Sequence, residues 1–203
     1  MSANEQLDVA IVVFDDVEVL DVCGPFEVFS VAGFVEDRKP FSVRLVAAEN
    51  NTVHARNGLK LLPDCTYSDC PVPDILVVPG GPGARPQSRD PHLLTFLQQM
   101  APQVRTVLSV CTGALIMGRA GLLDNQPATT HHRAIQELQD AAPSAQIQTQ
   151  VRYVRSGNMV LSGGVAAGID AALEVVADYC GPELAKSTAH YMEFPWNRNG
   201  EAY

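Results

Sequence analysis

The stretch Thr106–Gly118, "TVLSVCTGALIMG", joins an apolar, β-branched run to a run of small and apolar residues, with Cys111 at the junction. The run Val104–Val110 is short, β-branched and apolar on both faces, which is typical of a strand covered on both sides by helices. The residues Thr112–Ala120 then favour a helix. A residue at such a tight strand-to-helix turn projects its side chain out of the sheet. The stretch therefore predicts an α/β fold with a thiol at the carboxyl edge of the sheet.

The same alternation of strand and helix continues along the chain on both sides of this stretch. The other predicted strands are Leu7–Phe14, Phe41–Ala48, Asp74–Gly81 and Asn158–Gly164. The other predicted helices are Pro25–Ala32, Pro91–Met100 with Asp90 as its cap, His131–Ala142 and Val165–Tyr179. Alternating elements of this kind form βαβ units with right-handed crossovers, so we expect a mostly parallel central sheet between two helical layers.

The segment Thr52–Asp64 differs, because Asn57-Gly58 lies between two short apolar pieces. An Asn-Gly pair is a strong hairpin signal, so a small β-hairpin is expected beside the main sheet. No internal repeat and no long linker divides the sequence. We therefore predict a single domain over residues 1–203.

Composition and charge exclude several classes of function. The 203 residues are 46% hydrophobic and 18% charged, which fits one globular domain with a substantial core. The net charge of −9 and the scattered basic residues argue against nucleic acid as a partner. No segment approaches the roughly 20 apolar residues that span a bilayer, so we expect no membrane partner. The start "MSANEQLDVAIVVF" has no basic leader, and no signal peptide is predicted.

The five cysteines are read as reduced thiols, because their number is odd and no signal peptide is expected. This predicts a cytoplasmic protein. Cys65 and Cys70 have no histidine or second cysteine pair nearby, so no metal site is predicted. Buried small hydrophobic side chains are the simplest interpretation of Cys65, Cys70 and Cys180.

Three segments bring chemistry to the carboxyl ends of predicted strands, where ligands bind in such sheets. Gly80 and Gly81 end one strand and allow a ligand close to the backbone. "ATTHH" (residues 128–132) places two hydroxyls and two imidazoles after a short strand. Cys111 lies at the N-terminus of a helix, whose free N–H groups and dipole should make the thiol more acidic. A buried, inert cysteine is the alternative, and the helix N-terminus makes the reactive thiol the favoured interpretation.

Several of these motifs together resemble the ThiJ/PfpI superfamily, whose fold is class I glutamine amidotransferase-like and flavodoxin-like. The motifs are "VVPGG" (77–81), "SVCTGALIMGRAGLL" (109–123), "ATTHH", "VVFDDVEVLDVCGPFEVF" (12–29) and "SGGVAAGIDAALEVVA" (162–177). Cys111-Thr112, Leu20-Asp21 and Gly24-Pro25 are similar to isocyanide hydratases within it. Cys23 stands where that pattern has threonine, so the shape of the pocket is expected to differ. Sensor domains of AraC-type regulators share the layout, although no helix-turn-helix domain is expected in the short remainder, residues 190–203.

The resemblance implies a role for Asp21 that spacing alone does not reveal. It implies that Asp21 lies beside the Cys111 sulfur and acts as general acid and base. A carboxyl group beside a thiolate in a dry pocket should have a raised pKa. Capping of a helix that starts near Gly24-Pro25 is the alternative. The implied reaction adds water to an isocyanide through a Cys111 thioimidate and yields an N-substituted formamide.

The resemblance also implies how the surrounding residues contribute. Thr112 is expected to shape the pocket, and N–H groups near Gly81 and Thr112 are expected to stabilise developing charge. The substrate is a small electrophile, and no metal or organic cofactor is needed. A homodimer is implied, with the apolar surface of helix Pro25–Ala32 as its contact.

The remaining candidates for substrate contact are Gly80, Cys23, Thr130 and His131. A Cys–His pair suggests amidase chemistry, but in the resembling hydratases histidine is not the base. We therefore expect hydrogen-bonded packing as the main role of His131. A ligand-binding or redox-sensing domain, in which Cys111 is oxidised or liganded without turnover, is the alternative function. The intact Asp21 and Thr112 favour the enzyme.

Overall fold

The computed structural model describes residues 6–196 of the chain. Its strands are β1 (Leu7–Val12), β2 (Phe41–Ala47), β3 (Val53–His54), β4 (Lys60–Leu61), β5 (Cys65–Thr66), β6 (Ile75–Val78), β7 (Thr106–Val110), β8 (Pro127–Ala128), β9 (Gln146–Ile147), β10 (Tyr153–Ser156) and β11 (Met159–Ser162). Its α-helices are α1 (Val19–Val31), α2 (Ala84–Gln87), α3 (Pro91–Met100), α4 (Gly113–Arg119), α5 (Ile135–Ala141), α6 (Ala167–Cys180) and α7 (Pro182–Tyr191). Two 3₁₀ turns cover Arg56–Gly58 and His132–Ala134.

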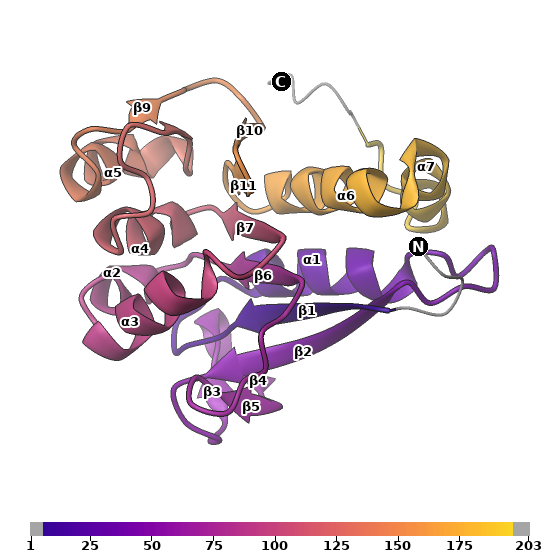
Figure 1. The fold of residues 1–203 in the computed structure, drawn as a ribbon, viewed down its shortest axis with the longest axis horizontal. Helices are drawn as coiled ribbons and strands as arrows, with labels where there is room; N and C mark the ends of the chain where they lie inside the picture. Colours follow the sequence, from indigo (N-terminus) through magenta and orange to yellow (C-terminus); the bar gives the residue numbers. More distant parts are fainter. Residues whose placement is uncertain (1–5, 197–203) are drawn as a thin grey trace.

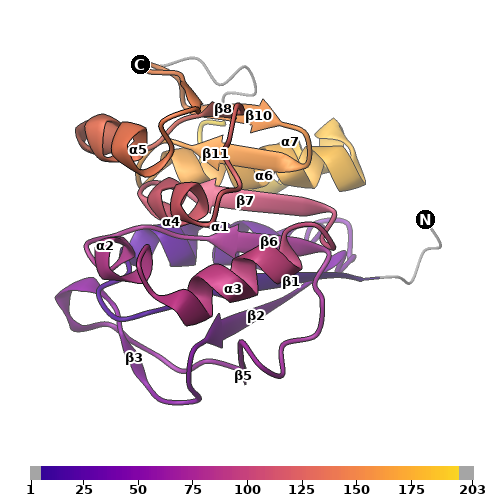
Figure 2. The same ribbon diagram turned by 60° about the vertical axis from the view of Figure 1, so that its left-hand side comes forward.

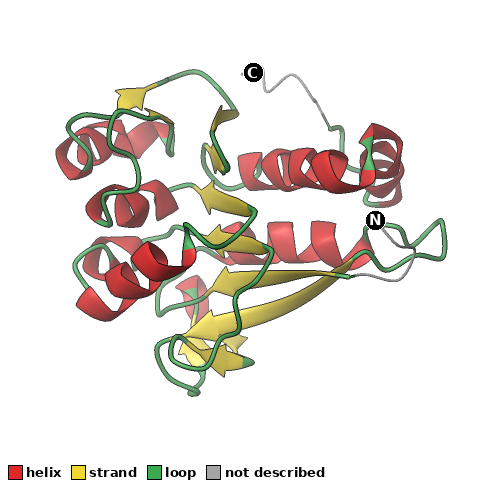
Figure 3. Ribbon diagram, viewed as in Figure 1, coloured by secondary structure: helices red, strands yellow, loops and turns green. Residues whose placement is uncertain are grey.

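A seven-stranded sheet in the order β10-β11-β7-β6-β1-β2-β5 forms the centre of the molecule (Figure 1). All of its pairs are parallel except the edge pair of β10 and β11. Helices lie on both sides of this sheet, with α1 and α6 on one face and α3 and α4 on the other (Figure 3). The predicted α/β sandwich with a mostly parallel sheet is confirmed. The prediction of a single domain over residues 1–203 stays a prediction, because residues 1–5 and 197–203 lie outside the described part.

The predicted hairpin in residues 52–64 is confirmed as the antiparallel pair of β3 and β4. The asparagine of its turn, Asn57, has φ = 62°, the left-handed conformation that favours Asn and Gly. The short strand expected before "ATTHH" is β8, whereas sequence patterning missed the short strands β5, β9 and β10 and the helices α2 and α7. Each of these strands has only two to four residues, so its alternation is too short to detect.

The first helix begins earlier than predicted. It starts at Val19 rather than at Pro25, so Pro25 lies inside α1. The prediction was wrong because proline is preferred in a first turn, whereas here the ring is tolerated within the helix. As a result Asp21 lies in the first turn of α1 and is not a residue before the helix. The helix predicted at Val165 starts instead at Ala167, and the one predicted at His131 begins with a 3₁₀ turn.

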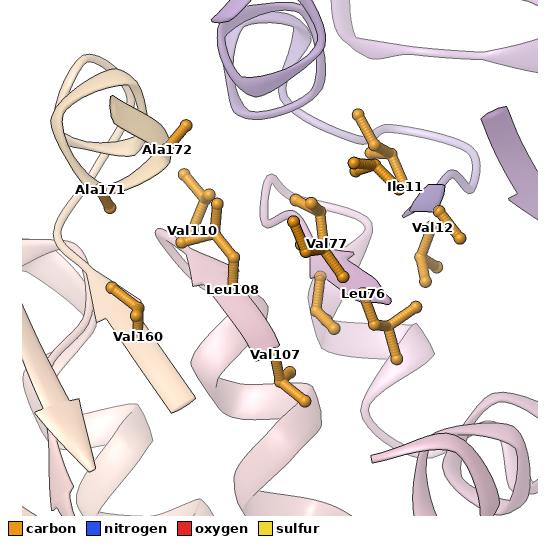
Figure 4. Packing of buried hydrophobic residues seen from close by; sticks show 14 of the residues in the cluster. Ile11, Val12, Leu76, Val77, Val107, Leu108, Val110, Val160, Ala171 and Ala172 are labelled. Atoms are coloured by element: carbon orange, nitrogen blue, oxygen red, sulfur yellow. The ribbon is translucent and has the colours of Figure 1, made fainter. Parts of the chain in front are cut away.

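The core covers both faces of the sheet, as the uninterrupted apolar strands predict. Every residue of β6, β7 and β11 is buried. Figure 4 shows Val110 of β7 and Val160 of β11 beside Ala171 and Ala172 of α6. Gly168 of α6 brings the helix backbone so close that an added Cβ would lie 2.7 Å from Val110 Cγ1. This close packing fixes the carboxyl end of β7. No helix within residues 6–196 has the length and apolar character to cross a membrane.

Candidate active site

Cys111 lies at the turn between β7 and α4, as predicted. Its φ of 57° is in the left-handed region, which a non-glycine residue occupies only when its surroundings hold it there. Its N–H donates to Gly163 O at 3.0 Å, and its carbonyl accepts from Thr130 Oγ1 at 2.8 Å. Its side chain is 6% exposed. The prediction of a strained strand-to-helix turn is confirmed.

Asp21 lies next to this turn because the start of α1 is hydrogen-bonded to the residues that follow β6. The N–H of Glu18, the residue before the helix, donates to Gly80 O at 2.9 Å. In return Gly80 N–H donates to Asp21 Oδ2 at 3.1 Å. The Asp21 side chain is completely buried, and its Oδ1 has no hydrogen-bond partner of normal geometry among residues 6–196. Oδ2 is therefore fixed by the hydrogen bond from Gly80, and Oδ1 can take up or release a proton.

The carboxyl and thiol groups influence each other's protonation. Burial raises the pKa of Asp21 from 3.8 to about 7, and the hydrogen bonds from Gly80 N–H and the Cys111 thiol offset only part of this effect. The predicted rise in the pKa of Asp21 is therefore confirmed. Because burial disfavours any charge that is not compensated, the pair carries at most one negative charge around neutral pH, and it holds a single proton as the pH rises above about 7.

The predicted acidity of the thiol is wrong. Burial, followed by the charge of Asp21, raises the pKa of Cys111 from 9.0 to about 12. The N–H of Thr112 at the start of α4 does lower this pKa, as the helix argument predicts, but desolvation outweighs it. The proton therefore rests on sulfur while Asp21 is ionised, which makes Asp21 the base that must accept it.

Val165 is a site residue that the sequence analysis missed. Its φ is 54°, a strained value for a β-branched residue. Its backbone N–H lowers the pKa of both Asp21 and Cys111 and so favours the ionised form of each group. The signal that could have revealed it is the pair Gly163-Gly164 directly before it, which marks a special turn rather than a helix start.

Thr112 connects the ends of two neighbouring strands. Its Oγ1 accepts from Gly81 N–H at 2.9 Å and donates to Gly81 O at 3.1 Å. Gly81 has φ = 118°, and an added Cβ would lie 2.3 Å from Glu18 N, so only glycine fits there. The N–H groups of Gly80 and Gly81 both donate within the protein. The expectation that the Gly81 N–H stabilises charge on the substrate is therefore not supported, whereas the Thr112 N–H does act on the thiol.

A pocket of about 360 Å³ opens at the thiol, within the range of small-molecule sites. Its lining residues are Glu18, Arg56, Gly81, Pro82, Arg85, Cys111, Thr112, His131, Arg133, Ala134, Glu137 and Val165. Two of the arginines are paired, Arg56 with Glu18 and Arg85 with Glu137, each at 2.7 Å. The sequence did not indicate these charged residues, because they come from separate loops and helices and share no motif.

The other predicted site residues are only partly brought together. His131 lines the thiol pocket, but its Nδ1 accepts from Arg133 N–H at 3.2 Å, and burial lowers its pKa. Thr130 is held by its bond to the Cys111 carbonyl and does not line this pocket. Cys23 does not line it either. Cys23 is two residues from Asp21 on one helix, and residues two apart on a helix point in different directions.

Comparison with known proteins identifies the family. The DJ-1/PfpI family matches residues 8–178 of the chain. The chain belongs to the DJ-1/PfpI family. It is 37% identical over 189 residues to "Isonitrile hydratase" of Pseudomonas putida. The matched region covers 93% of this chain and 78% of that protein.

A solved structure and a transcriptional regulator are also similar to the chain. A crystal structure of a ThiJ/PfpI family protein from Pseudomonas syringae has a TM-score of 0.85 at 29% identity, covering 95% of this chain and 77% of that one. The HTH-type transcriptional regulator GbdR of Pseudomonas aeruginosa is 26% identical over 94% of this chain. The chain spans about half of that regulator, 52% of its length.

Proposed function

We propose that the protein is a cysteine-dependent isocyanide hydratase, which adds water to R–N≡C and releases the N-substituted formamide R–NH–CHO. The observation that carries the proposal is the buried pair of Cys111 and Asp21 beside a pocket, with the pKa of Asp21 raised to about 7. An acid–base group with a pKa near the working pH is suited to take and return a proton in one cycle. The 37% identity to the Pseudomonas putida isonitrile hydratase supports the choice of substrate.

In the first half of the reaction a carbon–sulfur bond forms. The ionised Asp21 accepts the Cys111 thiol proton while the sulfur attacks the terminal carbon of the isocyanide. Asp21 then delivers the same proton to that carbon, which gives a thioimidate, R–N=CH–S, on Cys111. The N–H groups of Thr112 and Val165 stabilise the negative charge on sulfur, since both lower the pKa of Cys111.

In the second half water attacks the thioimidate carbon. Asp21, ionised again, accepts one proton from the water and passes it to the thioimidate nitrogen, which gives the tetrahedral adduct R–NH–CH(OH)–S. Asp21 then accepts the hydroxyl proton of this adduct while the carbon–sulfur bond breaks and the formamide is released. Sulfur leaves with its electron pair and takes this second proton from Asp21, which restores the resting thiol. One water is consumed and one carbon–oxygen bond is formed, with no net oxidation or reduction, so the residues themselves can carry every step.

Mass spectrometry of the intact protein mixed with phenyl isocyanide tests the proposal directly. We expect N-phenylformamide to accumulate in amounts exceeding the protein, with a transient adduct on Cys111 equal to the mass of one isocyanide. The Cys111→Ala variant should form neither, and Cys23→Ala should behave like the unchanged protein because Cys23 lies outside the pocket. Accumulation of formamide by Cys111→Ala would refute the proposed nucleophile.

A second candidate function is a ligand-binding domain without turnover. The observation that favours it is the 26% identity to the regulator GbdR over 94% of this chain. In that case an isocyanide or an oxidant would modify Cys111 once, and the molar amount of formamide would not exceed that of the protein. The same assay therefore separates the two functions by stoichiometry.

We also propose that the protein forms a homodimer in the cytoplasm. The apolar residues of α1 that were expected to form the dimer contact are mostly buried within one chain. We therefore propose that the contact is formed by exposed side chains near the ends of α1 and α7. Phe34 is 65% exposed and Val35 is 64% exposed, and the Phe34 ring lies 5.0 Å from that of Tyr191. Sedimentation at micromolar concentration should show a dimer for the unchanged chain and a monomer for Phe34→Glu. The matched change Leu62→Glu, at an exposed apolar side chain directly after β4, should leave the dimer intact.

A further inference from the structure

A second cavity of about 410 Å³ is lined by residues that are hydrogen-bonded to the Cys111 backbone, Thr130 and Gly163. It lies among the segments around β8, β10 and β11, which are near one another in Figure 2. Its lining residues are Thr129, Thr130, His131, His132, Ile135, Thr149, Gln150, Val151, Arg152, Gly163, Gly164 and Ala167. The proposed mechanism uses none of its side chains.

This cavity is connected to Cys111 through the backbone. Thr130 Oγ1 donates to the Cys111 carbonyl at 2.8 Å, and Cys111 N–H donates to Gly163 O at 3.0 Å. His131 lines both the cavity and the thiol pocket. Its ring lies so close to Gly164 that an added Cβ would be 2.0 Å from Cδ2. The His131 ring is therefore the partition between the two spaces.

The buried polar side chains on the walls of the cavity, Thr129, Thr130 and Arg152, are already engaged by the protein. The hydroxyls of Thr130 and Thr129 donate to backbone carbonyls at 2.8 Å, so their methyl groups are left as apolar surface. The buried Arg152 is neutralised by Asp170, with its Nε donating at 2.7 Å. Buried polar groups that are satisfied in this way gain nothing from a polar ligand.

Three aliphatic side chains form the hydrophobic part of the lining, beside the polar residues His132, Thr149 and Gln150. Ile135, Val151 and Ala167 contribute aliphatic side chains to the cavity. The His131 ring at its entrance is favoured in the neutral form, because burial and the nearby cations lower its pKa. A cavity of this size with apolar walls and no unbalanced charge is suited to an aromatic or cycloalkyl group.

We propose that this cavity holds the N-substituent of the isocyanide and selects bulky apolar substituents. The inference rests on the proposed function. The terminal carbon of the isocyanide lies at the Cys111 sulfur, and its N-substituent extends past His131 into the cavity. The hydrocarbon group is bound by burial of apolar surface. Methyl isocyanide, which has no group to place there, is then handled by the thiol pocket alone.

Filling the cavity tests the proposal. Thr149 is exposed at its rim, so Thr149→Trp can occupy the space with little effect on the fold. We expect kcat/KM for phenyl isocyanide to fall by about 10- to 200-fold, the range for a lost apolar contact, while kcat/KM for methyl isocyanide stays unchanged. The matched control is Thr95→Trp, at an exposed position in a distant cavity of about 410 Å³, and it should change neither value. Equal effects of Thr149→Trp on both substrates, or no effect on either, would overturn the proposal.

A binding measurement separates failure of this inference from failure of the proposed function. In methyl NMR, titration with N-phenylformamide should shift the signals of Ile135 and Val151, and formamide alone should not. These shifts would establish the cavity as a site for aryl groups even if neither isocyanide were turned over, which would refute the hydratase function alone. If the Ile135 and Val151 signals do not move, the cavity proposal is wrong regardless of activity.

Discussion

At the residue scale, the chemistry of the site depends on one proton shared by two buried groups. Asp21 is fully buried, and the Gly80 N–H donates to its Oδ2 at 3.1 Å. Because desolvation raises the pKa of both Asp21 and Cys111, the doubly ionised state is disfavoured. The state with one proton is the reactive one, whether the proton resides on sulfur or on oxygen. Removing the ability of Asp21 to ionise should therefore remove the reactive state.

The first prediction compares substitutions of the two groups. Asp21→Asn keeps the shape but cannot carry the proton, so turnover of phenyl isocyanide should fall by roughly 10²- to 10⁴-fold. Cys111→Ser should reduce it as strongly, because a hydroxyl is far harder to ionise than a thiol. In the unchanged protein kcat/KM should rise with pH through about 7 as Asp21 ionises. In Asp21→Asn that rise should be absent, and near-normal turnover by this variant would leave Asp21 with a structural role only.

At the element scale, the site depends on the close contact between the ends of strands β6 and β7 and the start of helix α4. Strands β6 and β7 are paired with Val78 opposite Ser109, so their carboxyl ends lie together. An added Cβ on Gly113, the first residue of α4, would lie 2.1 Å from Val78 O. The helix that follows Cys111 therefore begins directly against the end of the neighbouring strand. The atom that such a Cβ would meet belongs to the backbone of β6. It cannot move aside by a change of rotamer, as a side chain could.

The second prediction concerns this contact. Gly113→Ala should destabilise the protein by more than about 2 kcal/mol and displace Cys111, because overlap with backbone cannot be relieved by a rotamer change. Gly163→Ala is the matched control, since its added Cβ would meet no atom closer than 3.6 Å. Urea denaturation of both variants measures the difference. If Gly113→Ala is as stable as Gly163→Ala, the close approach of α4 to β6 is not a constraint.

Much of the arrangement of elements could be predicted from the sequence, because it rests on local patterns. The apolar runs at β1, β2, β6, β7 and β11 indicate strands buried on both faces, and the site cysteine follows one of them. Asp21 could be placed beside Cys111 only through the family resemblance, since α1 begins at Val19 and brings it there through bonds to Gly80. Val165 could not be placed, because its role depends on a backbone N–H that no side chain marks.

The direction of the thiol pKa shows what local reasoning misses. The helix N-terminus behind Cys111 acts as predicted, with the Thr112 N–H lowering the pKa. Burial by the surrounding elements and the charge of Asp21 raise it further than that N–H lowers it. Desolvation depends on the packing of segments that are distant in the sequence, so residues 106–118 alone cannot reveal it.

At the scale of the whole molecule, burying Asp21 reduces the stability of the fold at neutral pH. The pKa of Asp21 is about 7 in the folded protein and 3.8 when unperturbed. Between these two values the folded state binds more protons than the unfolded state, so stability falls as pH rises through this range. The full difference corresponds to about 4 kcal/mol, on the order of half of a typical domain's stability. The site is therefore maintained at a cost in stability that the rest of the core must offset.

The third prediction follows from this linkage and concerns the free energy of unfolding between pH 4 and pH 8. Asparagine does not ionise, so Asp21→Asn should have a stability close to that of the unchanged protein near pH 4 and exceed it increasingly as pH rises, by up to about 4 kcal/mol at pH 8. Urea denaturation at intervals of pH measures both proteins under the same conditions, and all other titrating groups contribute equally to the two curves. The thiol does not interfere, since its pKa is raised from 9.0 and it stays protonated throughout this range. Parallel curves would mean that Asp21 ionises as easily in the folded protein as in the unfolded chain, and the shared proton on which the mechanism depends would then be absent.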